Sequence, residues 1–284
     1  MACLLSVMGA FFCLGSDGLA ESPDGSGAAA RFFDGTDALR IVVLAPAAAD
    51  IVDKLGLKDC VVGVTSSVTD FPGASTVGTH RNPGIENIAA LRPSLIIASA
   101  RFSAELASRL GAELFIYEPR SLPAILEAIT QLAERTGKTE QGEALVASLA
   151  AMMPQPVKTD RPTVVYEVRS TPLSLAPQES FLANLLESAG FHYAHQGVSA
   201  EVSPEYILEN TPDFYIYQVG PMNKNPDPPL KRNGWRGMGA CIWKVDELAF
   251  ARPNTGSFAL VAALTAILAD DDPCEAGKSI FAGQ

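Results

Sequence analysis

Cations, histidines and aromatic residues are scarce in this chain of 284 residues. Lys plus Arg total 21 against 32 Asp plus Glu, and the resulting formal charge of −11 argues against nucleic acid as a partner. The uncharged run at residues 1–16 is shorter than the roughly 18 apolar residues that a membrane-spanning helix needs. We therefore expect a soluble protein body that does not act on nucleic acid.

Signatures of catalysis and cofactor binding are also missing. Thr136–Thr139 (TGKT) resembles the end of a phosphate-binding loop, but Leu132 stands where that loop needs a glycine. The chain has no C-x-x-C motif, no nucleophile elbow and no complete dinucleotide fingerprint. His192 and His195 have no third ligand at a suitable spacing, which favours a surface or loop pair over a metal site. The sequence predicts no catalytic residues, no metal site and no cofactor.

The N-terminal region has the features of an export signal. An uncharged run precedes the small residues Gly18–Ala20, so residues 1–20 are expected to be a cleaved signal peptide, although no Lys or Arg precedes the run. Cys13 follows two phenylalanines rather than small residues, which disfavours a lipid-modified cysteine. Residues 21–38, rich in Gly, Ala, Ser and Asp, predict a flexible leader.

Cleavage after residue 20 would leave Cys60, Cys241 and Cys274, an odd number that permits at most one disulfide. Cys241 and Cys274 lie in the same C-terminal region and are suited to pairing in an oxidising compartment. The alternative is three small buried hydrophobic side chains. The sequence leaves both alternatives open.

Short apolar runs alternate with helical spacing from residue 39 onward, which predicts an α/β fold with parallel sheets. Residues 121–153 show helical spacing interrupted near Gly137, and a second series of strands begins after Pro162. We expect an N-terminal lobe over 39–136, a linker helix over 137–156 and a C-terminal lobe over 157–284. The clearest strands are expected at 40–44, 60–64, 95–98, 113–117 and 163–168.

An internal repeat relates the two lobes. Glu86 and Glu205 are each followed by Ile at +2, Pro at +7 and Ile at +11, with an offset of 119 residues (205 − 86). Asn82–Pro83 and Ser203–Pro204 precede them as expected helix caps and first turns. Each Glu should therefore start a helix that leads into a buried strand. The two acids are either favourable charges at helix N-termini or a matched functional pair.

These segments resemble one known family, the periplasmic substrate-binding proteins of metal-chelate ABC importers. The resemblance implies two Rossmann-like lobes with parallel sheets, joined by a long rigid α-helix, with the ligand cleft between them. It also implies a periplasmic, monomeric, non-catalytic protein that delivers a small-molecule metal chelate to the permease subunits of an ABC transporter. The matching residues are 40–46, 50–51, 55–57, 61–65, 77–78, 82–98, 203–205, 212–213 and 252–253, within a span of 39–267.

The resemblance also assigns roles to individual residues. Glu86 and Glu205 fall where the family places the carboxylates that dock on the permease. His80 lies in a loop before the helix of Glu86, and its alternative is an exposed loop histidine. The ligand-binding residues that we expect on cleft-facing loops are Ala47, His80, Arg101, Glu167, Arg169, Gln218 and Arg252.

Departures from the family pattern bear on the ligand. Thr79 stands where haem binders commonly have a tyrosine, which disfavours haem. Arg101, Arg169 and Arg252 suit the carboxylate or catecholate oxygens of an anionic ferric chelate, or alternatively are surface cations. We expect a ferric siderophore or a cobalamin-like corrinoid as cargo. The alternatives are a haem or bare metal-ion carrier, and an enzyme or metal-cofactor scaffold with a similar architecture.

Overall fold

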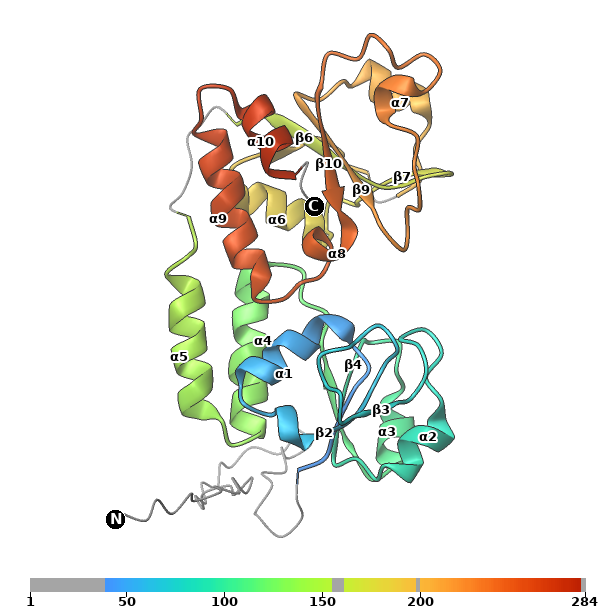
Figure 1. Cartoon of the computed structure of the whole chain (residues 1–284), viewed down its shortest axis with the longest axis vertical. Coiled ribbons are helices and arrows are strands. Elements are labelled where there is room, and N and C mark those ends of the chain that lie inside the picture. Colours follow the sequence, from blue (N-terminus) through green and yellow to red (C-terminus); the bar gives the residue numbers. More distant parts are fainter. Residues whose placement is uncertain (1–38, 155–160, 198–199, 282–284) are drawn as a thin grey trace, which may run out of the picture. The chain divides into compact units, whose positions relative to one another are not determined.

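The computed structural model describes residues 39–154, 161–197 and 200–281, and the chain divides into two compact units (Figure 1). Unit 1 contains the described residues up to Ile116 together with Gln131–Gly142, and unit 2 contains the rest. Residues 117–130, which the sequence placed in the first lobe, therefore group with unit 2. The expected signal peptide and leader lie outside the described residues.

Unit 1 is built on a five-stranded sheet in which every neighbouring pair is parallel, as the alternation of strands and helices predicts. The strand order is β3-β2-β1-β4-β5, so the apolar strand that opens the fold lies in the middle. The strands are β1 (Ile41–Val43), β2 (Val61–Val64), β3 (Ser75–Thr76), β4 (Leu95–Ala98) and β5 (Glu113–Ile116).

Alternation along β1 and β4 gives the sheet of unit 1 two buried faces. Val42 and Ile96 belong to one core cluster with Ile88 and Ala107, so the helices that carry these last two residues cover this face. Figure 1 shows α1 on the opposite face. The short helices are η1 (Pro46–Ala48), α1 (Ala49–Lys54), η2 (Lys58–Cys60), α2 (Ile85–Ala90) and α3 (Ala104–Arg109).

Unit 2 repeats this plan with additions. Its sheet has the order β10-β9-β6-β7, in which β9 pairs parallel with both β6 and β10, while β7 is antiparallel to β6. A short strand, β8, also pairs parallel with β6. The strands are β6 (Thr163–Ser170), β7 (Leu173–Leu175), β8 (His192–Tyr193), β9 (Phe214–Val219) and β10 (Cys241–Asp246).

One face of this second sheet is covered by an aromatic cluster. Trp243 is fully buried, and its ring centroid lies 4.9 Å from that of Phe214 and 5.5 Å from that of Phe281. Gly277 lies against the same indole, and a Cβ atom there would come within 2.2 Å of it. The helices on this side are α6 (Phe181–Ala189), α9 (Gly256–Leu268) and α10 (Pro273–Phe281), with α8 (Glu247–Phe250) and η3 (Pro229–Lys231) in the adjoining connections.

A disulfide joins Cys241 of β10 to Cys274 of α10, which decides between the two alternatives that the sequence leaves open. Cys60 is buried in unit 1. The bond closes a loop with a sequence separation of 33 residues, and the indole N–H of Trp243 donates to the Cys274 carbonyl 3.1 Å away. The C-terminal helix is therefore attached to the sheet edge both covalently and by packing.

The range expected as the linker helix, 137–156, contains α5 (Thr139–Ala150). A separate helix, α4 (Leu122–Arg135), precedes it, because the interruption near Gly137 ends that first helix. Gly137 adopts a φ of +68°, the left-handed conformation that commonly terminates a helix. The Lys138 N–H donates to the Ala133 carbonyl 2.7 Å away and closes the turn. In the part of the chain that the structure describes, the helices are too short or too polar to cross a membrane.

The repeat is confirmed at the level of secondary structure. Glu86 and Glu205 each occupy the second residue of a short helix, α2 or α7 (Pro204–Glu209), that leads into an internal strand, β4 or β9. Ser203 caps α7, and its hydroxyl accepts the Tyr206 N–H at 3.3 Å, as predicted. The expected cap at residues 82–83 is wrong, because Asn82 N–H donates to the Thr79 hydroxyl within a turn and Gly84 is the N-cap of α2.

Candidate binding site

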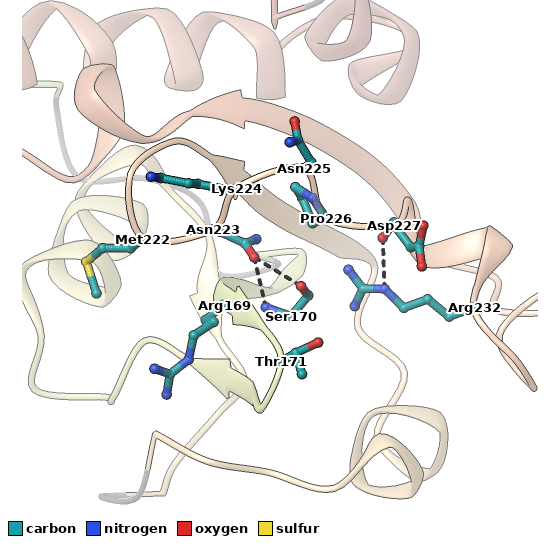
Figure 2. Close-up of a pocket in the computed structure, with 10 residues that line it drawn as sticks. All are labelled: Arg169, Ser170, Thr171, Met222, Asn223, Lys224, Asn225, Pro226, Asp227 and Arg232. Atoms are coloured by element: carbon teal, nitrogen blue, oxygen red, sulfur yellow. Dashed lines mark hydrogen bonds between the residues drawn. The ribbon is translucent and has the colours of Figure 1, made fainter.

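A polar pocket of about 390 Å³ lies in unit 2 at the carboxyl ends of β6 and β9 (Figure 2). Parallel α/β sheets bind ligands outside this edge, because the loops that follow the strands are free to vary there. The end of β6 supplies one side of the pocket, and the connection from β9 to β10 supplies the other. The lining residues are Arg169, Ser170, Thr171, Met222, Asn223, Lys224, Asn225, Pro226, Asp227 and Arg232.

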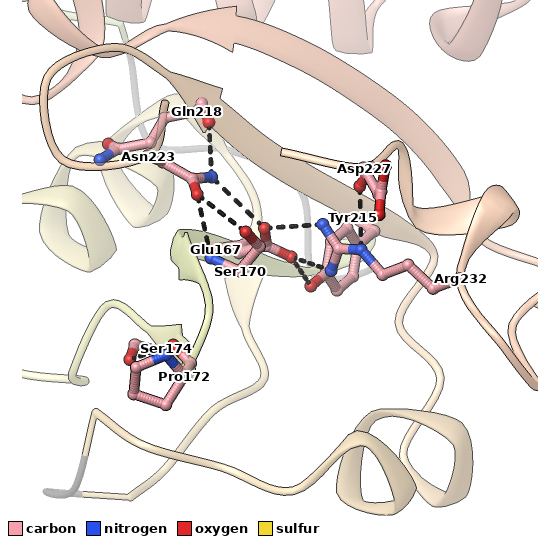
Figure 3. A network of polar contacts seen from close by, with 9 residues as sticks. All are labelled: Glu167, Ser170, Pro172, Ser174, Tyr215, Gln218, Asn223, Asp227 and Arg232. Atoms are coloured by element: carbon pink, nitrogen blue, oxygen red, sulfur yellow. Dashed lines mark hydrogen bonds and ion pairs between the residues drawn. The ribbon is translucent and has the colours of Figure 1, made fainter. Parts of the chain in front are cut away.

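A buried ion pair fixes the far end of this connection. Glu167 of β6 is fully buried, and its two carboxylate oxygens accept hydrogen bonds from the Arg232 guanidinium at 2.5 and 2.9 Å. Tyr215 donates its hydroxyl to the same carboxylate, and Figure 3 shows the three side chains converging. Burial and then the Glu167 charge raise the pKa of the Tyr215 hydroxyl well above its ordinary value. Tyr215 is therefore a neutral hydrogen-bond donor to Glu167.

Asn223 fixes the near end of the connection. It is 3% exposed, and its side-chain oxygen accepts from the Ser170 N–H at 3.0 Å and from the Ser170 hydroxyl at 3.1 Å. Its amide N–H groups donate to the Gln218 carbonyl at 2.8 Å and to Glu167 at 3.4 Å. One amide side chain thus links the ends of β6 and β9 beneath the pocket.

Arg169 offers the pocket a cation. Its guanidinium donates to the Ser174 hydroxyl at 3.3 Å and lies 3.6 Å from the Glu201 carboxylate. Within the described residues its Nε–H is buried without a hydrogen-bond partner. The Arg169 side chain is 42% exposed and Glu201 is 66% exposed, so solvent weakens this ion pair and the guanidinium remains available to an anionic group.

The structure corrects the location of three expected ligand residues. Glu167 and Arg169 lie inside β6 and Gln218 lies inside β9, rather than on loops. Of these, Glu167 and Gln218 are fully buried. The side chain of Gln218 donates to the Val168 carbonyl at 2.9 Å and accepts from the Tyr166 hydroxyl at 3.1 Å. The polar atoms of both side chains are therefore engaged with neighbouring protein groups beneath the pocket.

The remaining expected ligand residues follow strands at the same kind of edge. In unit 1, half-buried Ala47 lies in η1 after β1, exposed His80 lies between β3 and α2, and exposed Arg101 follows β4. In unit 2, Arg252 is half-buried and follows α8. The structure brings Arg169 into the pocket described above and places each of the others at a strand or helix end of its own unit.

The two candidate docking carboxylates are both exposed. A hydrogen bond from the Glu205 backbone N–H, followed by one from the Ser203 hydroxyl, lowers the pKa of the Glu205 carboxyl. Glu205 therefore remains ionised to a lower pH than an ordinary glutamate. The equivalent helix in unit 1 has Gly84 as its N-cap and no side chain that caps it.

His192 and His195 are the two histidines for which the sequence favours a surface or loop pair. His192 is exposed and lies 3.7 Å from Glu187, whereas His195 is 3% exposed and its Nδ1 lies 3.2 Å from the Tyr206 hydroxyl. His195 follows β8 outside regular secondary structure, so it is a loop residue but not a surface one. Within the described ranges, no group of three or more His, Cys, Asp and Glu residues is arranged to hold a metal ion.

Sequence reasoning missed Asn223, Lys224 and Arg232, which complete the pocket. Residues 220–236 contain no apolar period and match no motif, so they carry no signal for a specific contact. The available signal was their length and their proline content after the strand predicted to follow the helix of Glu205, which is typical of a functional connection. Only the fold shows that Arg232 reaches back to Glu167.

Comparison with known families places the chain in one of them. The family model described as periplasmic binding protein matches residues 41–240, a range that contains β1 of unit 1 and β9 of unit 2. The match covers more than half of the chain. The protein therefore belongs to the periplasmic binding protein family.

Individual relatives of this protein are named for different ligands. A cobalamin-binding protein of Halobacterium salinarum is 28% identical over 200 residues, which are 63% of this chain and 54% of that protein. The Fe(3+)-citrate-binding protein of Bacillus subtilis strain 168 is 26% identical over 198 residues, or 62% of this chain and 61% of the relative. The chain thus spans between half and two thirds of the length of these relatives.

The fold itself matches solved structures. The structure of IsdE from S. aureus complexed with heme has a TM-score of 0.66 and 18% identity, covering 81% of this chain and 99% of that one. At this identity the likeness concerns the fold alone. It confirms the prediction of an α/β binding-protein architecture with parallel sheets.

Proposed function

We propose that this protein captures an anionic metal chelate outside the cytoplasm and delivers it to the permease subunits of an ABC importer. The family match over residues 41–240 carries the proposal, because members of this family are binding proteins and the matched range includes strands of both sheets. Relatives named for cobalamin and Fe(3+)-citrate support a metal complex as the cargo. We propose that the carrier itself performs no catalysis.

Two observations support the extracytoplasmic location and the charge of the cargo. Cys241 and Cys274 form a disulfide, and such bonds persist in oxidising compartments. Arg169 and Lys224 line the unit 2 pocket, and guanidinium and ammonium groups bind carboxylate or catecholate oxygens through charge-assisted hydrogen bonds. A ferric siderophore or ferric carboxylate chelate fits this polar lining better than an apolar ligand does.

The direct contacts are assigned accordingly. Arg169 and the exposed residues His80 and Arg101 are proposed to contact the chelate, together with Ala47 and Arg252. Glu167 and Gln218 are proposed to support the pocket from beneath rather than to contact the cargo. Glu86 and Glu205 are proposed to dock on cations of the permease, because both carboxylates are exposed at equivalent places of the repeat.

The proposal is tested by titrating the purified chain with ferric citrate, a ferric hydroxamate, a ferric catecholate, cyanocobalamin and haem, with free ferric and zinc ions in parallel. Trp235 is a suitable fluorophore, because the Arg232 guanidinium that lines the pocket lies 5.1 Å from its ring. We expect tight binding of one anionic chelate class. Binding of the free ions alone, or chemical turnover of a titrated compound, would contradict the proposal.

A matched pair of variants locates the contact. Arg169→Gln should weaken binding of that chelate by about ten- to a hundredfold, the loss expected for a charge-assisted contact. Arg109→Gln is the control, because Arg109 is an exposed cation in the last turn of α3 and is assigned no contact with ligand. Equal effects of both substitutions would show that general charge, rather than the pocket, governs binding.

A further inference from the structure

The wall of the unit 2 pocket is an irregular segment, Met222–Arg232, whose shape is not explained by its own backbone. Its regular structure is the single turn η3 (Pro229–Lys231). Five residues of the segment are prolines or asparagines rather than strand formers. A segment of this kind keeps one conformation only if side chains attach it to the fold. Figure 2 shows it arching over the pocket, with Asn223 and Arg232 pointing inward.

Three residues of the segment attach it to the fold, and the side chains of two of them meet at one carboxylate. The Met222 N–H donates to buried Glu247 at 2.7 Å, which holds the start of the segment. Asn223 and Arg232, close to the start and at the end, both donate to Glu167. Figure 3 shows that Glu167 stands between them. One side chain of β6 therefore contacts both ends of the wall, while Ser170 and the Gln218 carbonyl also hold Asn223.

The electrostatics make this attachment mutual. Glu167 is 0% exposed and the Arg232 side chain is 15% exposed, so neither charge has much water to stabilise it. Burial lowers the pKa of the Arg232 guanidinium and Glu167 raises it, and the net direction is upward. Because removal of one partner leaves a buried charge uncompensated, the two side chains hold each other in place. The bidentate geometry also fixes the plane of the guanidinium.

We infer that Glu167 is a positioning residue of the ligand pocket, which acts by holding the segment Met222–Arg232 in its binding conformation through Arg232 and Asn223. This inference rests on the proposed function for the identity of the ligand, but not for the ordering of the segment. It replaces the expectation that Glu167 contacts ligand, because both of its oxygens already accept protein hydrogen bonds. The cargo is instead contacted by the exposed groups that this segment carries, such as Lys224.

The test compares Glu167→Gln with Glu113→Gln in the full chain. Glu113 is a matched control, since it also forms an ion pair with an arginine, Arg135, but lies in unit 1. Amide hydrogen exchange is measured over residues 222–232 and over α9 as an internal reference. We expect Glu167→Gln to speed exchange in the segment by about tenfold or more and to leave α9 near wild type. Glu113→Gln should leave both regions unchanged.

A ligand measurement separates positioning from simple stability. At a temperature far below the unfolding midpoint, the dissociation constant of the chelate identified above should rise by about tenfold in Glu167→Gln, because the folded protein itself is altered. Arg232→Lys keeps the charge but loses the bidentate geometry, so it should shift both readouts in the same direction by a smaller factor. It also serves if Glu167→Gln fails to fold.

Several results would overturn the inference. Wild-type exchange over 222–232 in Glu167→Gln, faster exchange spread evenly over unit 2, or an unchanged dissociation constant despite a lower unfolding midpoint would each assign Glu167 to general stability. If the wild-type protein binds no chelate in the panel, the proposed function fails. The exchange pattern then still decides whether Glu167 orders the segment.

Discussion

The two units repeat one topology but differ in how they complete it. In both, a short helix leads into an internal strand, β4 or β9, that pairs with a strand on each side. The paired residues in register are Ile41, Leu95 and Glu113 in unit 1 and Val164, Phe214 and Cys241 in unit 2. The connection after this internal strand runs over residues 99–112 in unit 1 and 220–240 in unit 2. The first contains a helix, α3, whereas the second contains only one 3-10 turn.

This difference shows how an irregular connection is kept in place. A helix satisfies most of its own backbone groups, so the connection in unit 1 needs few anchors. The longer connection of unit 2 is anchored by the buried carboxylates of Glu167 and Glu247 and by the amide of Asn223. Repetition of the sheet thus sets where the connection after this strand lies in each unit, while the side chains beneath it set its shape.

The largest expected effect concerns the feature that the units share. Replacing Glu86 and Glu205 together by Arg should reduce uptake in a transport assay by at least about tenfold, because each reversed charge would face a cation of the permease. Chelate affinity and the unfolding midpoint should stay near wild type, since both carboxylates are exposed. Glu209→Arg, an exposed acid at the other end of α7, is the control. Normal uptake in the double variant would show that the two acids only start helices and do not dock on the permease.

The cores of the units differ as well, and substitution of Trp243 tests the core of unit 2. Trp243→Ala should lower the free energy of unfolding by about 3–5 kcal/mol, because a fully buried indole leaves a cavity among Phe191, Phe214 and Phe281. Guanidinium denaturation followed by circular dichroism measures this loss. Hydrogen exchange in β4 of unit 1 should be unaffected, and a loss of protection there would show that the two units unfold together.

Removal of the disulfide should have a smaller effect. Cys241→Ala with Cys274→Ala is expected to lower the free energy of unfolding by about 2–4 kcal/mol, since the bond restricts a loop of 33 residues in the unfolded chain. The same denaturation experiment measures it. Cys60→Ala in unit 1 provides the control for loss of a cysteine without loss of a bond. Equal effects of the two changes would argue that packing, rather than the cross-link, holds α10.

The smallest expected effect separates the two helix starts of the repeat. Ser203→Ala removes the hydroxyl cap of α7 and should cost about 0.5–2 kcal/mol. It should also raise the pKa of the Glu205 carboxyl toward its ordinary value, because the Ser203 hydrogen bond favours the ionised form. Carbon-detected NMR titration of Glu205 measures the shift. Ser203→Thr keeps the hydroxyl and should preserve the low pKa, so a shift in both variants would rule out the cap as its cause.

Much of the fold was predictable from local pattern. The strands at β1, β4 and β9 are apolar runs bounded by Gly or Pro, and Ser203–Pro204 is a strong helix start that the structure confirms. The prediction for Asn82–Pro83 was wrong because the Thr79 hydroxyl draws the Asn82 N–H into a turn before α2 begins. Short-range competition of this kind is hard to read when two polar residues offer alternative caps.

The candidate site was less predictable. Arg169 was expected on a loop that faces the cleft, and it does line the pocket, although it lies in β6. Glu167 looked equally suitable, yet it lies two residues further inside β6, where it is fully buried and accepts a hydrogen bond from Tyr215. A charged residue is expected to be exposed unless its partner is known. Here the partner, Arg232, is 65 residues away in the sequence.

The α/β class and the repeat around Glu86 and Glu205 could be established from the sequence alone, because both follow from periodicity and spacing within short segments. The sequence also resembled a binding-protein family, and the family match over residues 41–240 confirms that resemblance. The pairing of Cys241 with Cys274 and the support of the pocket wall by Glu167 are visible only in the tertiary structure. Both depend on contacts between residues far apart in the chain. The pairing of a buried charge or a thiol depends on the neighbour that the fold brings to it, and local pattern carries no record of that neighbour.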